Sequence, residues 1–266
     1  MELQLSGRRA LITGGSRGIG KAVAAALGAE GATVAIAARS AERLRRAAEE
    51  LHLASGRLVH AFAVDTGNEE SVRGMVEAAQ QSMGGVDILV NCAARPGAQT
   101  PTPNLAGITG EDFFADVNVK VLGYLRCAQA VAPGMVAAGW GRIISVSGLA
   151  ARTTGSIVGS IRNVAVSALT KNLADELGPQ GVNVTAVHPG LTRTEATDGV
   201  LAARAARDGV EREEAERKLS GGSTIGRMVD ASEVAQLITF LASPLSVAIN
   251  GESIACGGGT PGVIHY

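Results

Sequence analysis

The chain has 266 residues, of which 46% are hydrophobic and 18% charged, so it can bury a full core without disulfide bonds and is too apolar to be disordered. Its 24 basic and 25 acidic residues nearly cancel, which excludes the basic surface that nucleic acid or an anionic membrane requires. Scattered cysteines and histidines indicate reduced thiols and no metal site, and the lack of an apolar signal or membrane-spanning segment indicates a cytoplasmic protein.

Short apolar runs alternate with amphipathic segments along the chain. The runs predict strands at residues 8–13, 33–38, 58–64, 86–90, 142–146 and 182–187. Between them the sequence predicts a helix that ends at residue 27 and helices at 41–52, 69–82, 111–138, 158–177 and 232–242. This alternation is typical of an α/β protein, and we predict a doubly wound Rossmann fold, a parallel sheet of about seven strands with helices on both faces.

One segment interrupts this rhythm. Residues 195–220 are rich in alanine, arginine and glutamate, and we expect a helical, lid-like insertion there. No linker and no shift in composition divides the rest of the chain, so residues 1–266 are predicted to form a single Rossmann-type domain.

The first strand leads into a glycine-rich turn, GGSRGIG at residues 14–20, that opens the first helix. The glycines allow a tight turn and close approach of the backbone to a pyrophosphate, while the helix N-terminus offers N–H groups to an anion. An ordinary turn can have this spacing, but its place at the carboxyl end of a parallel strand favours nucleotide binding. The predicted phosphate-binding residues are Gly14, Ser16, Arg17, Gly18, Ile19 and Gly20.

The end of the second strand predicts which nucleotide binds. An acidic residue there would bind a ribose 2′-hydroxyl, but this chain has Ala38 followed by Arg39. Arg39 and Arg17 are suited to a 2′-phosphate instead, so we expect NADP (NADPH) to be preferred over NAD. The alternative for Arg39 is a solvated charge at the start of a helix.

A series of motifs follows in order: AVDTGN at 63–68, NCAA at 91–94, DVNVKVLG at 116–123, GRIISVS at 141–147, HPGLTRTE at 188–195 and a glycine-rich end at 226–259. With the glycine turn, they make nearly the whole chain resemble the short-chain dehydrogenase/reductase family. The resemblance implies that Asp65 and Thr66 hold the adenine, that Asn91 and Ala93 line the ribose, and that Pro189, Gly190, Thr192 and Thr194 surround the nicotinamide.

The resemblance also implies a homo-oligomer. In the family, the helix that here contains Asn118 and Tyr124 and the helix after Gly159 form a dimer contact, and the final strand commonly completes a tetramer. Packing of these helices against their own sheet is the alternative.

The catalytic residues of the family are not found at their usual places. Its reductases protonate the carbonyl oxygen with the tyrosine of a YxxxK motif, beside a serine. The chain has only Tyr124 and Tyr266, and neither precedes a lysine by four residues. Alignment by the neighbouring motifs puts Gly159 and Asn163 in the tyrosine and lysine places and Gly148 in the serine place, one residue after Ser147.

Polar residues near these places are candidates to bind a carbonyl oxygen. We predict Asn118, Ser147 and Asn163 as catalytic residues, with Ser160 and Arg162 as further candidates, although such groups orient a carbonyl better than they protonate it. His188 is more often packed at a strand end in this position than catalytic. Tyr124 is expected on the outer face of its helix, and Tyr266 could act only from a neighbouring subunit.

Three functions stay open. The first is an NADP-dependent oxidoreductase that acts on a carbonyl or hydroxyl group of a small-molecule substrate with non-standard catalytic residues. The second is a nucleotide-binding sensor or scaffold without hydride transfer, which Gly159 and Asn163 favour. The third is a lyase or isomerase on the same fold, for which polarising a carbonyl is sufficient.

Overall fold

The computed structural model describes residues 2–95 and 104–262. Seven parallel strands form one sheet in the order β3-β2-β1-β4-β5-β6-β9, which confirms the predicted doubly wound α/β fold. The strands are β1 Arg9–Thr13, β2 Thr33–Ala38, β3 Val59–Ala63, β4 Ile88–Asn91, β5 Gly141–Val146, β6 Val182–Pro189 and β9 Ser253–Cys256. A separate short pair joins β7 Thr192–Arg193 to β8 Val229–Asp230.

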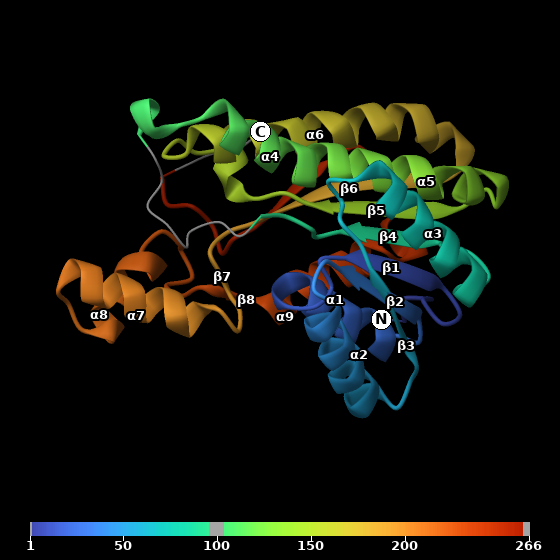
Figure 1. The fold of residues 1–266 in the computed structure, drawn as a ribbon, viewed down its shortest axis with the longest axis horizontal. Helices are drawn as coiled ribbons and strands as arrows, with labels where there is room; N and C mark the ends of the chain where they lie inside the picture. The colour runs from blue at the N-terminus through green and yellow to red at the C-terminus, as the bar shows by residue number, and fades with distance from the viewer. Residues whose placement is uncertain (1, 96–103, 263–266) are drawn as a thin grey trace.

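Helices cover both faces of the sheet (Figure 1). One face carries α1 Gly18–Ala29, α2 Ala41–Ser55 and α9 Ala231–Leu241, and the other carries α3 Glu69–Met83, α4 Gly110–Val117, α5 Gly123–Ala137 and α6 Ile157–Leu177. Within residues 195–220, α7 Thr197–Asp208 and α8 Arg212–Ser220 lie to one side of the sheet. Short 3-10 turns occur at Leu105–Gly107, Leu149–Ala151, Gly178–Gln180 and Pro244–Ser246. In the described ranges, no helix is both long and apolar enough to span a bilayer.

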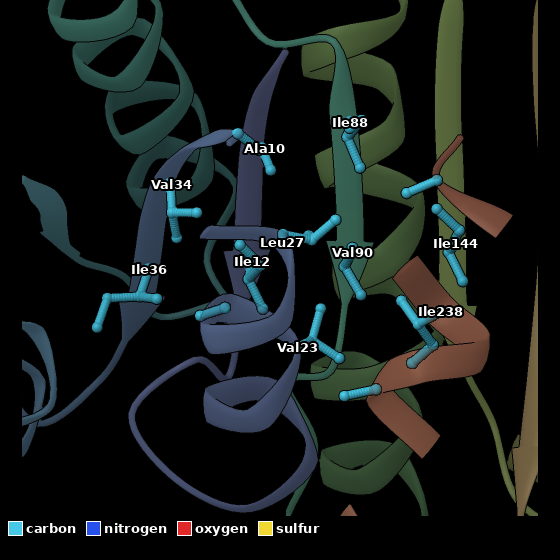
Figure 2. Packing of buried hydrophobic residues seen from close by; sticks show 14 of the residues in the cluster. Ala10, Ile12, Val23, Leu27, Val34, Ile36, Ile88, Val90, Ile144 and Ile238 are labelled. Carbon is cyan, nitrogen blue, oxygen red and sulfur yellow. The ribbon is translucent and has the colours of Figure 1, made fainter. Parts of the chain in front are cut away.

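Two layers of apolar side chains hold the helices against the sheet. Figure 2 shows Val23 and Leu27 of α1 and Ile238 of α9 packed over the central strands. On the opposite face, residues of α3, α5 and α6 pack against the same strands. Both faces of the central strands are therefore buried, as expected for a parallel sheet.

The predicted helix over residues 111–138 is present, but it is not α-helical throughout. A π-helical turn, η2 at Asn118–Leu122, separates α4 from α5. Because a π-turn takes more residues than an α-turn, it rotates the residues that follow about the helix axis. Tyr124 points inward with 1% of its surface exposed, and its hydroxyl donates to the Val146 carbonyl oxygen at 3.0 Å, so the expected outer position of Tyr124 is wrong.

Candidate active site

The glycine turn is pressed against the end of β4. Gly14 has a φ of +69°, and a Cβ atom on it would lie 2.8 Å from the Cys92 carbonyl carbon. A Cβ on Gly20 would in turn collide with the Gly14 carbonyl oxygen. Side chains are excluded at both positions, so the turn can bring bare backbone to a ligand at the carboxyl edge of the sheet.

The N-terminus of α1 opens beside this turn. Arg17 is the N-cap residue, and its side chain makes no capping hydrogen bond. The Gly18 N–H instead donates to the Glu195 Oε2 atom at 2.9 Å. A carboxylate from the segment after β7 therefore lies where the positive end of the α1 dipole favours an anion. The sequence analysis missed this contact because 177 residues separate the two partners.

Arg17 belongs to the glycine turn, and Arg39 follows β2, whose Ala37 carbonyl oxygen accepts from the Gly15 N–H at 3.3 Å. Both are exposed, and within residues 2–95 and 104–262 neither guanidinium forms an ion pair with a carboxylate. Ser16 and Ile19 are half-buried, and Ile19 packs against the core under α1. Two cations without bound carboxylates flank the turn, as binding of a phosphorylated ribose would require.

Asn91, the last residue of β4, is a buried polar side chain with no partner in the described part of the chain. It is 1% exposed, and neither its amide nitrogen nor its amide oxygen has a hydrogen-bond partner. Thr13 Oγ1 accepts from the N–H groups of Cys92 at 3.3 Å and Ala93 at 3.4 Å, which ties β1 to the segment after β4. An unsatisfied buried amide at the ligand edge fits a site that a polar ligand completes.

The loop after β3 is held by polar contacts within itself and with the π-turn. The Asp65 carboxylate accepts from the Gly67 N–H at 3.0 Å, and the Thr66 hydroxyl donates to the Val119 carbonyl oxygen at 3.0 Å. The Asn118 amide donates to the Gly67 carbonyl oxygen at 3.0 Å. Asn118 thus joins the π-turn to the predicted adenine loop. Its side chain is bonded to that loop and not to Ser147 or Asn163, the other two predicted catalytic residues.

The segment after β6 returns to the glycine turn. A Cβ on Gly190 would lie 2.7 Å from Gly257 Cα, and one on Gly18 would lie 3.4 Å from Thr194 Cγ2. The Thr192 hydroxyl donates to the Gly190 carbonyl oxygen at 3.0 Å. Pro189, at the end of β6, starts this segment. These contacts bring the predicted nicotinamide segment and the predicted phosphate turn to the same edge of the sheet.

Ser147 and Asn163 lie together where β5 meets the start of α6. The Ser147 hydroxyl donates to the Asn163 carbonyl oxygen at 3.0 Å, and both residues are buried. Lys120 of the π-turn joins them, since its Nζ donates to the Ser147 carbonyl oxygen at 2.9 Å and to Asn163 Oδ1 at 2.8 Å. The sequence analysis did not single out Lys120.

The bonds of Lys120 also orient the Asn163 amide. An ammonium can only donate, so Oδ1 faces Lys120 and Nδ2 faces away from it. A Cβ on Gly148 would lie 3.3 Å from Nδ2, and no described residue accepts a hydrogen bond from that atom. Gly159, in the tyrosine place, donates its N–H to Ser156 Oγ at 3.0 Å and lies against that side chain.

The titratable groups near Ser147 and Asn163 differ in how readily they can donate a proton. Burial lowers the pKa of Lys120 to about 7. Burial also lowers the pKa of His188 to about 4, and its Nε2 lies 3.1 Å from the Ser167 hydroxyl. Burial raises the pKa of Tyr124 well above its ordinary value. At neutral pH, Lys120 is therefore the group among these three that exchanges a proton most readily.

Known proteins resemble this chain along its whole length. A family model described as enoyl-(acyl carrier protein) reductase matches residues 14–260. The 3-oxoacyl-(acyl-carrier-protein) reductase FabG of Aquifex aeolicus is 33% identical over 270 residues, 97% of this chain and 99% of that protein. The structure of L-sorbose reductase from Gluconobacter frateurii, complexed with NADPH and L-sorbose, matches with a TM-score of 0.93 and 28% identity over 99% of this chain and 100% of that chain. Actinorhodin polyketide ketoreductase with NADPH matches with a TM-score of 0.87 and 31% identity over 97% of this chain and 98% of that chain.

Proposed function

Because the chain belongs to the short-chain dehydrogenase/reductase family, we propose that it is an NADP(H)-dependent oxidoreductase of the cytoplasm that interconverts a carbonyl and a hydroxyl group on a small molecule. We further propose that it is a divergent member, in which Gly159 and Asn163 replace the tyrosine and lysine of the family motif. No metal is part of this proposal.

One observation carries the choice of cofactor: two exposed arginines flank a glycine turn that has no room for side chains at Gly14 and Gly20. The backbone N–H groups at the start of α1 would hold the pyrophosphate, and Arg17 and Arg39 would hold the 2′-phosphate. The buried Asn91 amide would find a partner in the nicotinamide ribose. The solved relatives complexed with NADPH support this assignment.

The reaction that we propose is a hydride transfer, for which the bound reduced nicotinamide supplies the hydride. Asn163 Nδ2 would donate a hydrogen bond to the substrate carbonyl oxygen, and the Ser147 hydroxyl would hold Asn163 in place. Asn118 would hold the adenine loop against the π-turn through its hydrogen bond to Gly67. We propose that residues 195–220 close over the substrate as a lid.

The test is a screen of candidate substrates with the purified protein and NADPH, using ketoses, ketones and 3-oxoacyl thioesters. A substrate-dependent fall in NADPH absorbance supports the oxidoreductase. Formation of a product without nucleotide turnover would support the lyase or isomerase reading instead. Tight NADPH binding with neither result across all three substrate classes would favour the sensor or scaffold.

The position of Glu195 gives a prediction about affinity. Its carboxylate accepts from the Gly18 N–H, where the pyrophosphate is proposed to bind, so the two negative groups compete. We expect Glu195→Gln to bind NADPH about 3- to 10-fold more tightly, which corresponds to roughly 1 kcal/mol. Fluorescence titration measures this change. The exposed Glu213→Gln on α8 is the control, and unchanged or weaker binding by Glu195→Gln would refute the competition.

We also propose that two copies of the chain pair through the face formed by α4, η2 and α6. Large apolar side chains are exposed there: Phe114, Leu122, Ile157, Ile161 and Val164. Burying them against a second copy would remove apolar surface from water. Light scattering should give the mass of a dimer or tetramer, and Ile161→Glu should shift it toward the monomer. A monomeric unaltered protein would contradict this proposal.

A further inference from the structure

Lys120 differs from every other lysine in the chain. Lys21, Lys171 and Lys218 are bonded at the surface to Glu50, Asp175 and Glu214, respectively. Lys120 is 4% exposed, and its two described hydrogen bonds go to neutral oxygens. Burying an ammonium without a bonded carboxylate costs free energy, which a purely structural role does not require.

The Lys120 ammonium lies at the edge of the sheet where the carboxyl ends of the strands meet. The strand ends of β4 and β5 are neighbours, with Asn91 paired to Ser145. The Nζ atom donates to the carbonyl oxygen of Ser147, just past the end of β5. Lys120 thus lies at the carboxyl end of β5, beside β4, where open parallel sheets bind their ligands.

Asn163 connects this ammonium to the proposed substrate position. By alignment it stands where the family has a lysine on α6, and its Oδ1 accepts from Lys120 on the π-turn. A cation from another element therefore reaches the residue that replaces the motif lysine. Oδ1 and Nδ2 belong to one small amide, so a carbonyl oxygen held at Nδ2 would lie near enough to Nζ for a proton to pass directly or through one water.

We propose that Lys120 is the proton donor of this site, in place of the absent tyrosine; this inference rests on the proposed oxidoreductase function. As the hydride from the reduced nicotinamide bonds to the carbonyl carbon, the π-electron pair moves to the oxygen. That oxygen takes the third ammonium proton, which neither Ser147 nor Asn163 accepts. The products are the alcohol, the oxidised nicotinamide and a neutral amine, which regains its proton from water.

The surroundings of Lys120 suit such a transfer. Burial and the Arg162 guanidinium of α6 lower the pKa of Lys120, while Asp116 of α4 raises it, with a result of about 7. Asp116 is itself bonded to Arg162, and burial raises the pKa of the Cys92 thiol to about 12, which keeps that thiol neutral. His188 of β6, with its pKa of about 4, is also neutral at pH 7. The ammonium is therefore poised to give and regain a proton near neutral pH.

The chain has only four lysines, so NMR of protein labelled with ¹³C-lysine tests this proposal without a known substrate. In the free protein we expect one εCH2 resonance to titrate at a pH of about 7, and Lys120→Met to remove it. The resonance of Lys171, whose pKa is raised by its hydrogen bond to Asp175, should titrate above the ordinary value of about 10.4. Four resonances that all titrate above about pH 9 would overturn the proposal.

Comparison of the two nucleotide complexes tests proximity to the reacting ring. The oxidised nicotinamide carries a positive charge that the reduced ring lacks, so the Lys120 resonance should titrate about one pH unit or more lower with NADP⁺ than with NADPH. The resonance of the exposed Lys171 should not shift between the complexes. If both nucleotides bind and Lys120 titrates at the same pH in the two complexes, the role of Lys120 is overturned, but the proposed oxidoreductase function is not. Failure of both nucleotides to bind would overturn the proposed function, and with it the proton transfer.

Discussion

The Gly14→Ala protein is expected to lose NADPH binding by a factor of at least about 100, or roughly 3 kcal/mol. The added Cβ would lie 2.8 Å from the carbonyl carbon and oxygen of Cys92 and 2.9 Å from the Ala93 nitrogen. All three atoms are backbone, so the turn itself must move. A displaced turn would no longer present its N–H groups to the pyrophosphate. Fluorescence titration with NADPH measures the loss.

The Gly56→Ala protein separates this collision from backbone strain. Gly56 has a φ of +67°, close to the +69° of Gly14, but no atom lies within 4 Å of its added Cβ. We expect this variant to lose about 1 kcal/mol of stability and to bind NADPH normally. Thermal unfolding followed by circular dichroism checks that both variants fold. A folded Gly14→Ala protein with unchanged affinity would contradict the assigned phosphate site.

The Arg39→Ala protein should bind NADPH about 10- to 100-fold more weakly, because a charge-assisted contact to a phosphate contributes about 1.5–3 kcal/mol. Its affinity for NADH should change by less than about twofold, since NADH has no 2′-phosphate to lose a contact with. The ratio of the two dissociation constants, measured on one preparation, isolates this contact from any general damage.

Arg45→Ala is the matched control for Arg39. Arg45 is exposed on α2 and forms no ion pair with a described residue, so the substitution makes the same change in net charge away from the turn. Its NADPH affinity should stay within about twofold of the unaltered protein at moderate salt. Equal losses in both arginine variants would indicate a general charge effect and contradict a specific role for Arg39.

Local patterns in the sequence were sufficient to predict the fold and the glycine turn between β1 and α1. The apolar runs at residues 33–38 and 142–146 became β2 and β5 within a residue of the predicted bounds, because strands buried on both faces are continuous apolar runs. The turn at 14–20 was predictable because its glycines are close in sequence, and Gly14 and Gly20 have no room for a Cβ atom.

Ser147 and Asn163 were predicted from their places in the aligned motifs, but the approach of Lys120 to them was not predictable, because the three residues come from three elements. Lys120, Ser147 and Asn163 meet only through the packing of η2, β5 and α6. One signal for Lys120 was nevertheless present in the sequence. It lies four residues before Tyr124 and so continues the buried stripe of Tyr124, Ala128, Val131 and Met135. Lysine is rarely buried without a partner, so a lysine in an apolar stripe indicates a buried charge that is bonded or functional.

The π-turn and the Glu195 contact had no local signal. Residues 118–122 contain neither proline nor glycine, so the helical pattern predicted one straight helix. Glu195 reaches Gly18 only because β6 and β1 end at the same edge of the sheet. The prediction for Tyr266 lies outside the described residues.

Titration of the unaltered protein with NADPH and with NADH, followed by nicotinamide fluorescence, tests the central claim most directly. The site described above predicts saturable binding of both nucleotides, with NADPH at least about tenfold tighter because of its 2′-phosphate. Absence of binding, or tighter binding of NADH than of NADPH, would contradict the account of this chain as an NADP(H)-dependent oxidoreductase.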